Sequence, residues 1–183
     1  MIRPPGAIEA LDRLHQNREA MRALRESYRR SDPEWLAAAD ALTLALAAGM
    51  ERSTAGTLHE VRWADIAPWV RLQVLDVWAS WHEGTAETCP CWPVPQRLEL
   101  VVTALWRPGL IACPDCARTL LRARGEADRT CDLCGHVVAG LDEGEPIYPR
   151  TLAYGHMLVS WGECPGCKTV PPGPARKGKG GRV

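Results

Sequence analysis

The sequence predicts an α+β protein in which an N-terminal three-helix bundle packs on a C-terminal module of short β-hairpins. Two observations support this division. Up to about residue 85, apolar residues recur at helical spacing, and capping residues separate the helical segments. Beyond it, all eight cysteines of the 183 residues form close pairs between short β-branched runs. We therefore expect a helical region over 1–85, a cysteine-rich module over 86–170 and a basic, flexible tail over 171–183.

The first expected helix runs over 7–30. One of its faces is apolar, because Leu14, Met21 and Tyr28 follow Ala7 at seven-residue intervals. Arginines occupy the other faces. These faces are therefore either solvated or able to bind phosphate groups or a partner.

The second and third expected helices each begin at a capping residue and carry a proline in the first turn. The second begins at Ser31 and ends near Met50. The third begins after Asp65 and ends at Gly84. The apolar run over 35–50 is shorter than a membrane span and is broken by polar residues, so we expect no membrane association.

The remaining regular structure is expected to be short strands. The stretch 98–106 is apolar and β-branched, and forms either a strand or a short helix. Short strands are expected over 119–124 and 137–141. Apolar runs over 110–112 and 157–161 lead into the second and fourth cysteine pairs.

The cysteines form four pairs with one or two residues between the members of each pair, and no cysteine is left over. Eight thiolates in four chelating pairs match two four-coordinate metal sites, and zinc is the metal that most often takes four sulfurs. We therefore expect two zinc ions as cofactors. The pairs are Cys89/Cys91, Cys113/Cys116, Cys131/Cys134 and Cys164/Cys167.

The two inner pairs, over about residues 110–141, resemble a zinc ribbon. Fourteen residues separate them, and Gly135 follows the second pair where a left-handed residue is commonly needed to finish the turn. The resemblance implies that each pair lies at the tip of a β-hairpin and that the two tips face each other. It thereby implies a first zinc site formed by Cys113, Cys116, Cys131 and Cys134.

The outer pairs then remain for a second zinc site, formed by Cys89, Cys91, Cys164 and Cys167 in a nested arrangement. Two alternatives stay open. The pairs can instead combine in sequence order, the first with the second. A histidine can also replace a sulfur, and the candidates are His82, His136 and His156.

Two other kinds of chemistry use the same residues. A Cys-x-x-Cys pair can act in thiol redox exchange, although such enzymes need one reactive pair on a βαβ scaffold and not four pairs. Iron held by four sulfurs would carry out electron transfer, as in rubredoxins. Rubredoxins surround their iron with aromatic residues, and the ribbon segment has none.

The charge distribution argues against general nucleic-acid affinity, because the formal net charge is zero. Any phosphate binding must come from local basic surfaces. The candidates lie near the predicted ribbon tip and in the tail. They are Arg118, Arg122, Arg124, Arg129, Arg176, Lys177 and Lys179.

Eight tryptophans are many for this length, and we expect at least five of them in the core. Trp92 and Trp106 flank the cysteine region, so they are expected to pack the metal module onto the helices. An exposed indole would instead indicate a partner surface or a platform for base stacking.

These features favour a cytoplasmic, non-enzymatic zinc-binding protein that acts as an adaptor or regulator through protein or nucleic-acid contacts. The N-terminus lacks the apolar stretch of a signal peptide, and no motif indicates a small-molecule substrate or an active site. One alternative is an architectural component of a larger assembly, such as a viral or mobile-element particle, with purely structural zinc. The other is a redox or iron–sulfur electron-transfer protein.

Overall fold

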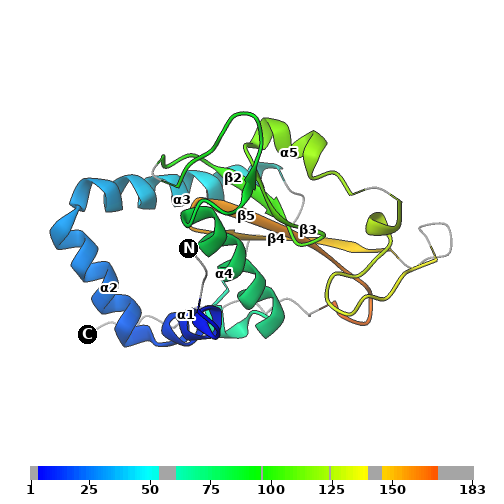
Figure 1. The fold of residues 1–183 in the computed structure, drawn as a ribbon, viewed down its shortest axis with the longest axis horizontal. Coiled ribbons are helices and arrows are strands. Elements are labelled where there is room, and N and C mark those ends of the chain that lie inside the picture. The colour runs from blue at the N-terminus through cyan, green and yellow to red at the C-terminus, as the bar shows by residue number, and fades with distance from the viewer. Residues whose placement is uncertain (1–3, 54–60, 96, 124, 140–145, 169–183) are drawn as a thin grey trace, which may run out of the picture.

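The computed structural model describes residues 4–53, 61–95, 97–123, 125–139 and 146–168. The expected basic tail over 171–183 lies outside the described residues. Within these ranges the predicted α+β class is confirmed, because five α-helices accompany a five-stranded mixed sheet (Figure 1).

The helices lie mainly in the N-terminal half. They are α1 (Ala7–Gln16), α2 (Arg18–Ser31), α3 (Pro33–Ser53), α4 (Pro68–His82) and α5 (Pro114–Leu120). Figure 1 shows α2 and α3 as an arch beside the sheet, and α3 leads back to the sheet at strand β4 (Tyr148–Tyr154). No helix in the described part of the chain is both long and apolar enough to cross a membrane.

The single helix expected over 7–30 is divided at Asn17. The Asn17 side chain accepts hydrogen bonds from the N–H groups of Glu19 and Ala20, at 3.1 and 3.0 Å, and so caps α2. The cap turns α2 away from the direction of α1, and none of the side chains described in α2 is buried. Tyr28 of the predicted apolar face and the nearby Leu24 are therefore 46% and 43% exposed.

The sheet is built from two antiparallel hairpins that meet in parallel. Strands β2 (Val101–Ala104) and β3 (Arg107–Ala112) form one hairpin, and β4 and β5 (Met157–Glu163) form the other. β2 pairs with β5 in parallel, and the short β1 (Glu87–Thr88) adds to β3, giving the order β1-β3-β2-β5-β4.

The stretch 98–106, for which a strand and a short helix were both open, contains the strand β2, and the apolar runs over 110–112 and 157–161 lie in β3 and β5. β4 was not expected from the sequence. It carries Pro149 and lies at the edge of the sheet that the described strands form, and an edge strand tolerates a proline because its outer side needs no strand partner.

One core joins α4 to the sheet. Val70, Val74 and Val77 of α4 are at most 2% exposed and pack against Ile111 and Val159 of the strands. Each such side chain contributes on the order of 1.5–3 kcal/mol when it leaves water. α5 packs on β2 and β3 over a second apolar cluster. The expected third helix and its end at Gly84, which has φ 71°, are confirmed.

A buried ion pair holds α1 against α4. Asp12 of α1 and Arg71 of α4 are each 7% exposed, and the Arg71 Nε donates to Asp12 Oδ1 at 2.8 Å. Arg71 Nη2 donates to Asp12 Oδ2 at 3.1 Å, so the pair is bidentate. Trp63 Nε1 and Gln16 Nε2 also donate to the carboxylate, each at 2.8 Å. Every strong acceptor position of this buried carboxylate is thereby used.

Candidate metal centres

The eight cysteines assemble into two groups of four, and all have free thiols. Within each group the four sulfur atoms lie within 4.8 Å of one another. We call Cys89, Cys91, Cys113 and Cys116 the first centre, and Cys131, Cys134, Cys164 and Cys167 the second centre.

Two sulfur–sulfur distances in the structure match a tetrahedral zinc site. The Cys91 and Cys116 Sγ atoms are 3.7 Å apart, and those of Cys134 and Cys164 are 3.8 Å apart. Zn–S bonds of about 2.3 Å in a regular tetrahedron give sulfur–sulfur edges of about 3.8 Å. A disulfide would bring the atoms to about 2.05 Å. The donor set and its spacing therefore fit a metal ion bound by four thiolates.

The nested grouping predicted from the sequence is wrong. The structure does not assemble Cys113, Cys116, Cys131 and Cys134 into one site. Nor does it bring Cys89 and Cys91 to Cys164 and Cys167. The pairs combine in sequence order, which was the open alternative. The two cysteine pairs of the predicted zinc ribbon belong to different centres. The structure therefore retains two four-cysteine clusters that could bind metal, but not the ribbon grouping.

Strand pairing explains the first centre. β1 runs parallel to β3, with Thr88 opposite Ile111, so the residue after β1 reaches the residues after β3. The Cys89 N–H donates to the Ile111 carbonyl at 3.0 Å, and the Cys113 N–H points at the Cys89 Sγ at 3.4 Å. The parallel register therefore places the first pair beside the second.

The second pair opens a helix and does not form a hairpin tip. Cys113 is the N-cap of α5, and Pro114 occupies the first turn, where a proline has no hydrogen bond to lose. The strand predicted over 119–124 is accordingly wrong, because α5 continues to Leu120. α5 presents Cys116 one turn after Cys113, on the side of the helix where Cys91 lies.

The second centre does contain a hairpin tip. Thr130 and Val137 form an antiparallel bridge, the Cys131 N–H donates to the His136 carbonyl, and the Gly135 N–H donates to the Cys131 carbonyl. Both hydrogen bonds are 2.8 Å long. Gly135 has φ 73°, which confirms the left-handed residue expected there.

Strand β5 carries Cys164 to this hairpin. The Asp132 N–H donates to the Gly162 carbonyl at 3.0 Å, and the Gly162 N–H donates to Asp132 Oδ2 at 2.6 Å. A Cβ atom at Gly162 would lie only 2.4 Å from Cγ2 of Ile147, so glycine permits this close approach. These contacts place Cys131 and Cys164, which are both buried, in the same centre.

The thiols of the two centres do not ionise alike without a cation. A hydrogen bond to Cys113 raises the pKa of Cys116 to about 12, and a hydrogen bond to Cys134 raises the pKa of Cys167 to about 12. Without a metal, the neighbouring thiols therefore oppose ionisation of these two cysteines.

Cys131 behaves in the opposite way. Burial opposes its ionisation, but backbone N–H groups at Cys164, Cys134 and Leu133 together lower its pKa to about 7. Backbone N–H groups directed at a sulfur stabilise a thiolate whether or not a metal is bound. The second centre is therefore preorganised for negative charge at the buried Cys131 sulfur. A divalent cation bound there would balance that charge.

The candidate histidines do not join either group among the described residues. The His82 ring packs 4.1 Å from the Trp78 ring, and the His156 ring lies 5.3 Å from that of Trp81, measured between centroids. His136 contributes its backbone carbonyl to the second centre's hairpin. Each centre therefore has the all-sulfur donor set that zinc takes in structural sites.

Only part of the predicted basic surface can be placed. Arg118 and Arg122 are exposed on and after α5. The Arg129 Nε donates to the Val138 carbonyl at 2.9 Å, so this side chain braces the second centre's hairpin. The other four candidates, Arg124, Arg176, Lys177 and Lys179, lie outside the described residues.

Trp92 departs most from its expected role. Trp106 packs within the metal module and not onto the N-terminal helices, since it lies against an apolar cluster of β2, β3 and α5 residues and its Nε1 donates to the Leu121 carbonyl. Trp92, in contrast, is 72% exposed, so the expectation that it packs the module onto the helices is wrong. Its φ of 51° makes it the one non-glycine residue with a left-handed backbone in the described ranges. No sequence signal distinguishes it from the other tryptophans.

The grouping predicts how double variants retain zinc against a competing chelator. Cys91→Ser/Cys116→Ser removes two ligands from the first centre, so we expect one tightly held ion, in the second. Cys116→Ser/Cys134→Ser removes one ligand from each centre, so we expect both ions to be lost at low chelator concentration. Native mass spectrometry during the titration would distinguish the two patterns. The reverse pattern would restore the nested grouping.

No protein-family model matches this chain, and neither a curated protein nor a solved structure matches it.

Proposed function

We propose that this chain is a zinc-binding protein with two structural ions, and that it acts as a non-enzymatic adaptor or regulator through contacts with another macromolecule. The observation that carries the proposal is the pair of four-cysteine groups whose sulfur–sulfur distances of 3.7 and 3.8 Å equal those of a zinc tetrahedron. A four-thiolate zinc ion is coordinatively closed, and its role is to hold chain segments together.

The surroundings of the centres support zinc over iron. The first centre packs on Ala112, Leu121 and Trp106, and the second packs on Val138 and Ile147. Aliphatic side chains dominate both surroundings, unlike the several aromatics around a rubredoxin iron. Zinc has no redox chemistry and is the metal that four sulfurs in a tetrahedron most often hold.

The exposed apolar side chains support a protein partner. Trp92 and Leu44 are each 72% exposed, and Trp35 and Trp69 are 37% and 38% exposed. Aromatic residues and arginine are enriched in protein–protein interfaces. The zero net charge supports a protein partner over a nucleic acid, because nucleic-acid binding depends on an excess of positive charge.

A second candidate is an architectural component of a larger assembly. The observation that favours it is the arch of α2 and α3 (Figure 1). Leu44, near the middle of α3, is exposed, and the residues next to it in the sequence are largely alanine and leucine. An apolar helix is normally covered by other protein. Both candidate functions include structural zinc. They differ in whether the complex with the partner is transient, as for an adaptor, or permanent, as for a component of an assembly.

Metal content is the experiment that tests the proposal. Native mass spectrometry of protein purified without added metal should find two zinc ions and eight reduced cysteines per chain. Bound iron, or disulfides with no metal, would contradict the zinc proposal and direct attention to electron transfer or thiol exchange.

The nucleic-acid alternative makes a separate prediction. We expect labelled single-stranded DNA and RNA to bind the protein only weakly, with affinities that Arg118→Ala/Arg122→Ala changes less than about twofold. Fluorescence anisotropy at several salt concentrations measures this. Tight binding that falls steeply with salt and drops at least about tenfold in the double variant would instead assign a nucleic-acid partner.

A further inference from the structure

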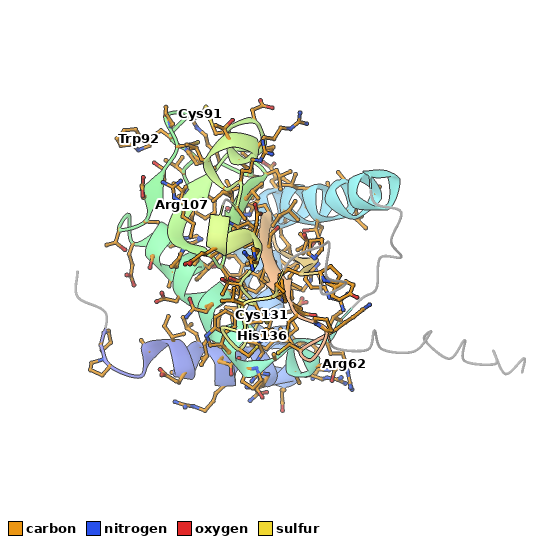
Figure 2. All side chains as sticks on the ribbon, turned by 90° about the vertical axis from the view of Figure 1, so that its right-hand side faces the viewer. Arg62, Cys91, Trp92, Arg107, Cys131 and His136 are labelled. Carbon is orange, nitrogen blue, oxygen red and sulfur yellow. The ribbon has the colours of Figure 1, made fainter. Side chains whose placement is uncertain are left out.

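The two centres differ in how far the protein shields their sulfurs from solvent. Cys131 and Cys164 of the second centre are buried, whereas Cys89 alone is buried among the four cysteines of the first centre, all of which the structure describes. Figure 2 shows Cys91 at the upper edge of the molecule, beside Trp92, and Cys131 well below it. The first centre is therefore the more open of the two to a small reagent from solvent.

Each centre has one exposed cysteine, and these two exposed sulfurs have different contacts. The exposed cysteine of the second centre, Cys134, accepts a hydrogen bond from the backbone N–H of His136. The exposed cysteine of the first centre, Cys91, interacts with the sulfurs of Cys113 and Cys116. A backbone N–H that donates to a thiolate lowers its basicity and with it its nucleophilicity. Cys91 is therefore the exposed sulfur better able to attack an electrophile.

Cys116 is the sulfur best placed to form a disulfide with Cys91. Their Sγ atoms are 3.7 Å apart, and a disulfide needs about 2.05 Å, so the two must approach by about 1.7 Å. The other two sulfurs accept backbone hydrogen bonds. Cys89 is buried and accepts from the Cys113 N–H at 3.4 Å, and Cys113 accepts from the backbone N–H of Cys116. Cys116 itself is half-buried and interacts with the neighbouring sulfurs.

The loop that carries Cys91 is held at both ends. The Cys89 N–H donates to the Ile111 carbonyl at 3.0 Å, and the buried Trp81 of α4 donates its Nε1 to the Pro93 carbonyl at 3.0 Å. Neither hydrogen bond involves a sulfur, so both can persist when the metal leaves. They keep Cys91 close to α5, which favours a disulfide within one chain over one between two chains.

We propose that the first centre is a site of reversible oxidation, at which a peroxide joins Cys91 to Cys116 in a disulfide and releases the ion of this centre alone. The second centre keeps its ion and continues to hold β5 to its hairpin. The proposal rests on the proposed function, because it requires a zinc ion in each centre of the reduced protein.

The reaction balances with one peroxide and two thiolates. The Cys91 thiolate attacks one peroxide oxygen, so an S–O bond forms, the O–O bond breaks and hydroxide leaves. The Cys116 thiolate then attacks the oxidised sulfur, so the S–S bond forms, the S–O bond breaks and a second hydroxide leaves. The two sulfurs together lose two electrons, which the peroxide gains. Cys89 and Cys113 alone cannot complete a four-sulfur set, so the ion is released.

Native mass spectrometry during graded treatment with hydrogen peroxide tests the proposal. We expect one ion to leave at least about tenfold faster than the other, because oxidation follows the exposure and thiolate character of a cysteine. Peptide mapping of the one-zinc protein should find a disulfide between Cys91 and Cys116, with the four cysteines of the second centre still reduced. Reduction by a small thiol, followed by added zinc, should restore two ions.

A histidine at position 91 gives the sharper comparison. Cys91→His retains a nitrogen ligand, and zinc accepts three sulfurs with one imidazole, but the attacking thiolate is gone. We expect loss of the first centre's ion to slow at least about tenfold. Cys134→His makes the same exchange at the second centre, and the first centre's ion should still leave at the wild-type rate. Peptide mapping of the wild type decides the proposal by itself if a variant fails to bind two ions.

The same measurements separate this proposal from the proposed function. Release of both ions at similar rates, earlier release from the second centre, or a disulfide between other cysteines would overturn the oxidation site and leave the two-zinc protein intact. A two-zinc Cys91→His protein as sensitive to peroxide as the wild type would do the same. Absence of zinc before any peroxide is added would contradict the proposed function itself.

Discussion

Removal of zinc by a strong chelator is expected to unfold the sheet. Structural zinc supplies roughly 10–16 kcal/mol of folding free energy in zinc-finger peptides at neutral pH. The strands that the centres hold are short, since β1 has two residues and β2 has four. The apolar area that these short strands bury cannot replace the folding free energy that two ions supply. Hydrogen exchange at the Cys89 and Cys131 amides, which donate to Ile111 and His136 carbonyls, should therefore become fast after chelation.

The control for this experiment is the same protein under reducing conditions without the chelator. Its amides should stay protected, and zinc added back to the chelated sample should restore protection. Protection that survives complete removal of the metal would show that the cysteines do not hold a structural ion, and the centres would need another explanation.

Acid should release the same ions. Zinc and protons compete for the thiolates, and the metal-free chain holds its protons firmly, with pKa values of about 12 at Cys116 and Cys167. Zinc binding must displace these protons, so its affinity falls as the pH falls. A colorimetric zinc indicator should detect more release at pH 5 than at pH 7. Release that is independent of pH would contradict thiolate ligation.

Asp12→Ala is expected to lower the free energy of unfolding by about 3–5 kcal/mol, because it leaves the Arg71 guanidinium buried without its partner. The loss should appear as a lower midpoint in urea denaturation of the zinc-bound protein. Asp65→Ala is the matched control. It also breaks an arginine–aspartate pair, with Arg62, but both of those side chains are exposed, so we expect a much smaller loss than in Asp12→Ala.

The contribution of Asp12 should also depend on pH. The Arg71 hydrogen bond holds the pKa of Asp12 below its ordinary value, and Trp63 adds to this effect, although burial opposes it. A depressed folded-state pKa stabilises the protein above the unfolded pKa of about 3.9, and this stabilisation is lost as the pH falls through the folded value. The stability difference between wild type and Asp12→Ala should therefore be full at pH 6 and shrink below pH 4. Taking the difference between the two proteins removes the separate effect of zinc release. A difference that stays constant with pH would show that the ionised carboxylate is not what stabilises the fold.

Elements that are determined by residues close together in the sequence could be predicted. Capping residues and helical spacing predicted α3 and α4, and the left-handed glycines Gly84 and Gly135 lie where expected. Predictions that weighed one local signal against another were less successful. Apolar spacing favoured one helix over 7–30, but the side chain of Asn17 caps a new helix in the middle of it. The alternating pattern of β4 was missed because Pro149 weakens a strand signal, and only an edge position accommodates it.

The sequence by itself determined that each of the four cysteine pairs can offer two sulfurs to one metal ion, because one or two intervening residues hold two sulfurs close whatever the rest of the chain does. Which pairs share an ion was decided only by the tertiary structure. The parallel pairing of β1 with β3 brings Cys89 to Cys113, and the docking of β5 on the hairpin brings Cys164 to Cys131. The exposure of Trp92 was decided in the same way, by the loop that the first centre and Trp81 hold. Chelation within a pair is a local property of the sequence. Which two pairs come together depends instead on the register between strands that are distant in the chain, and the spacing of cysteines within a pair does not encode that register.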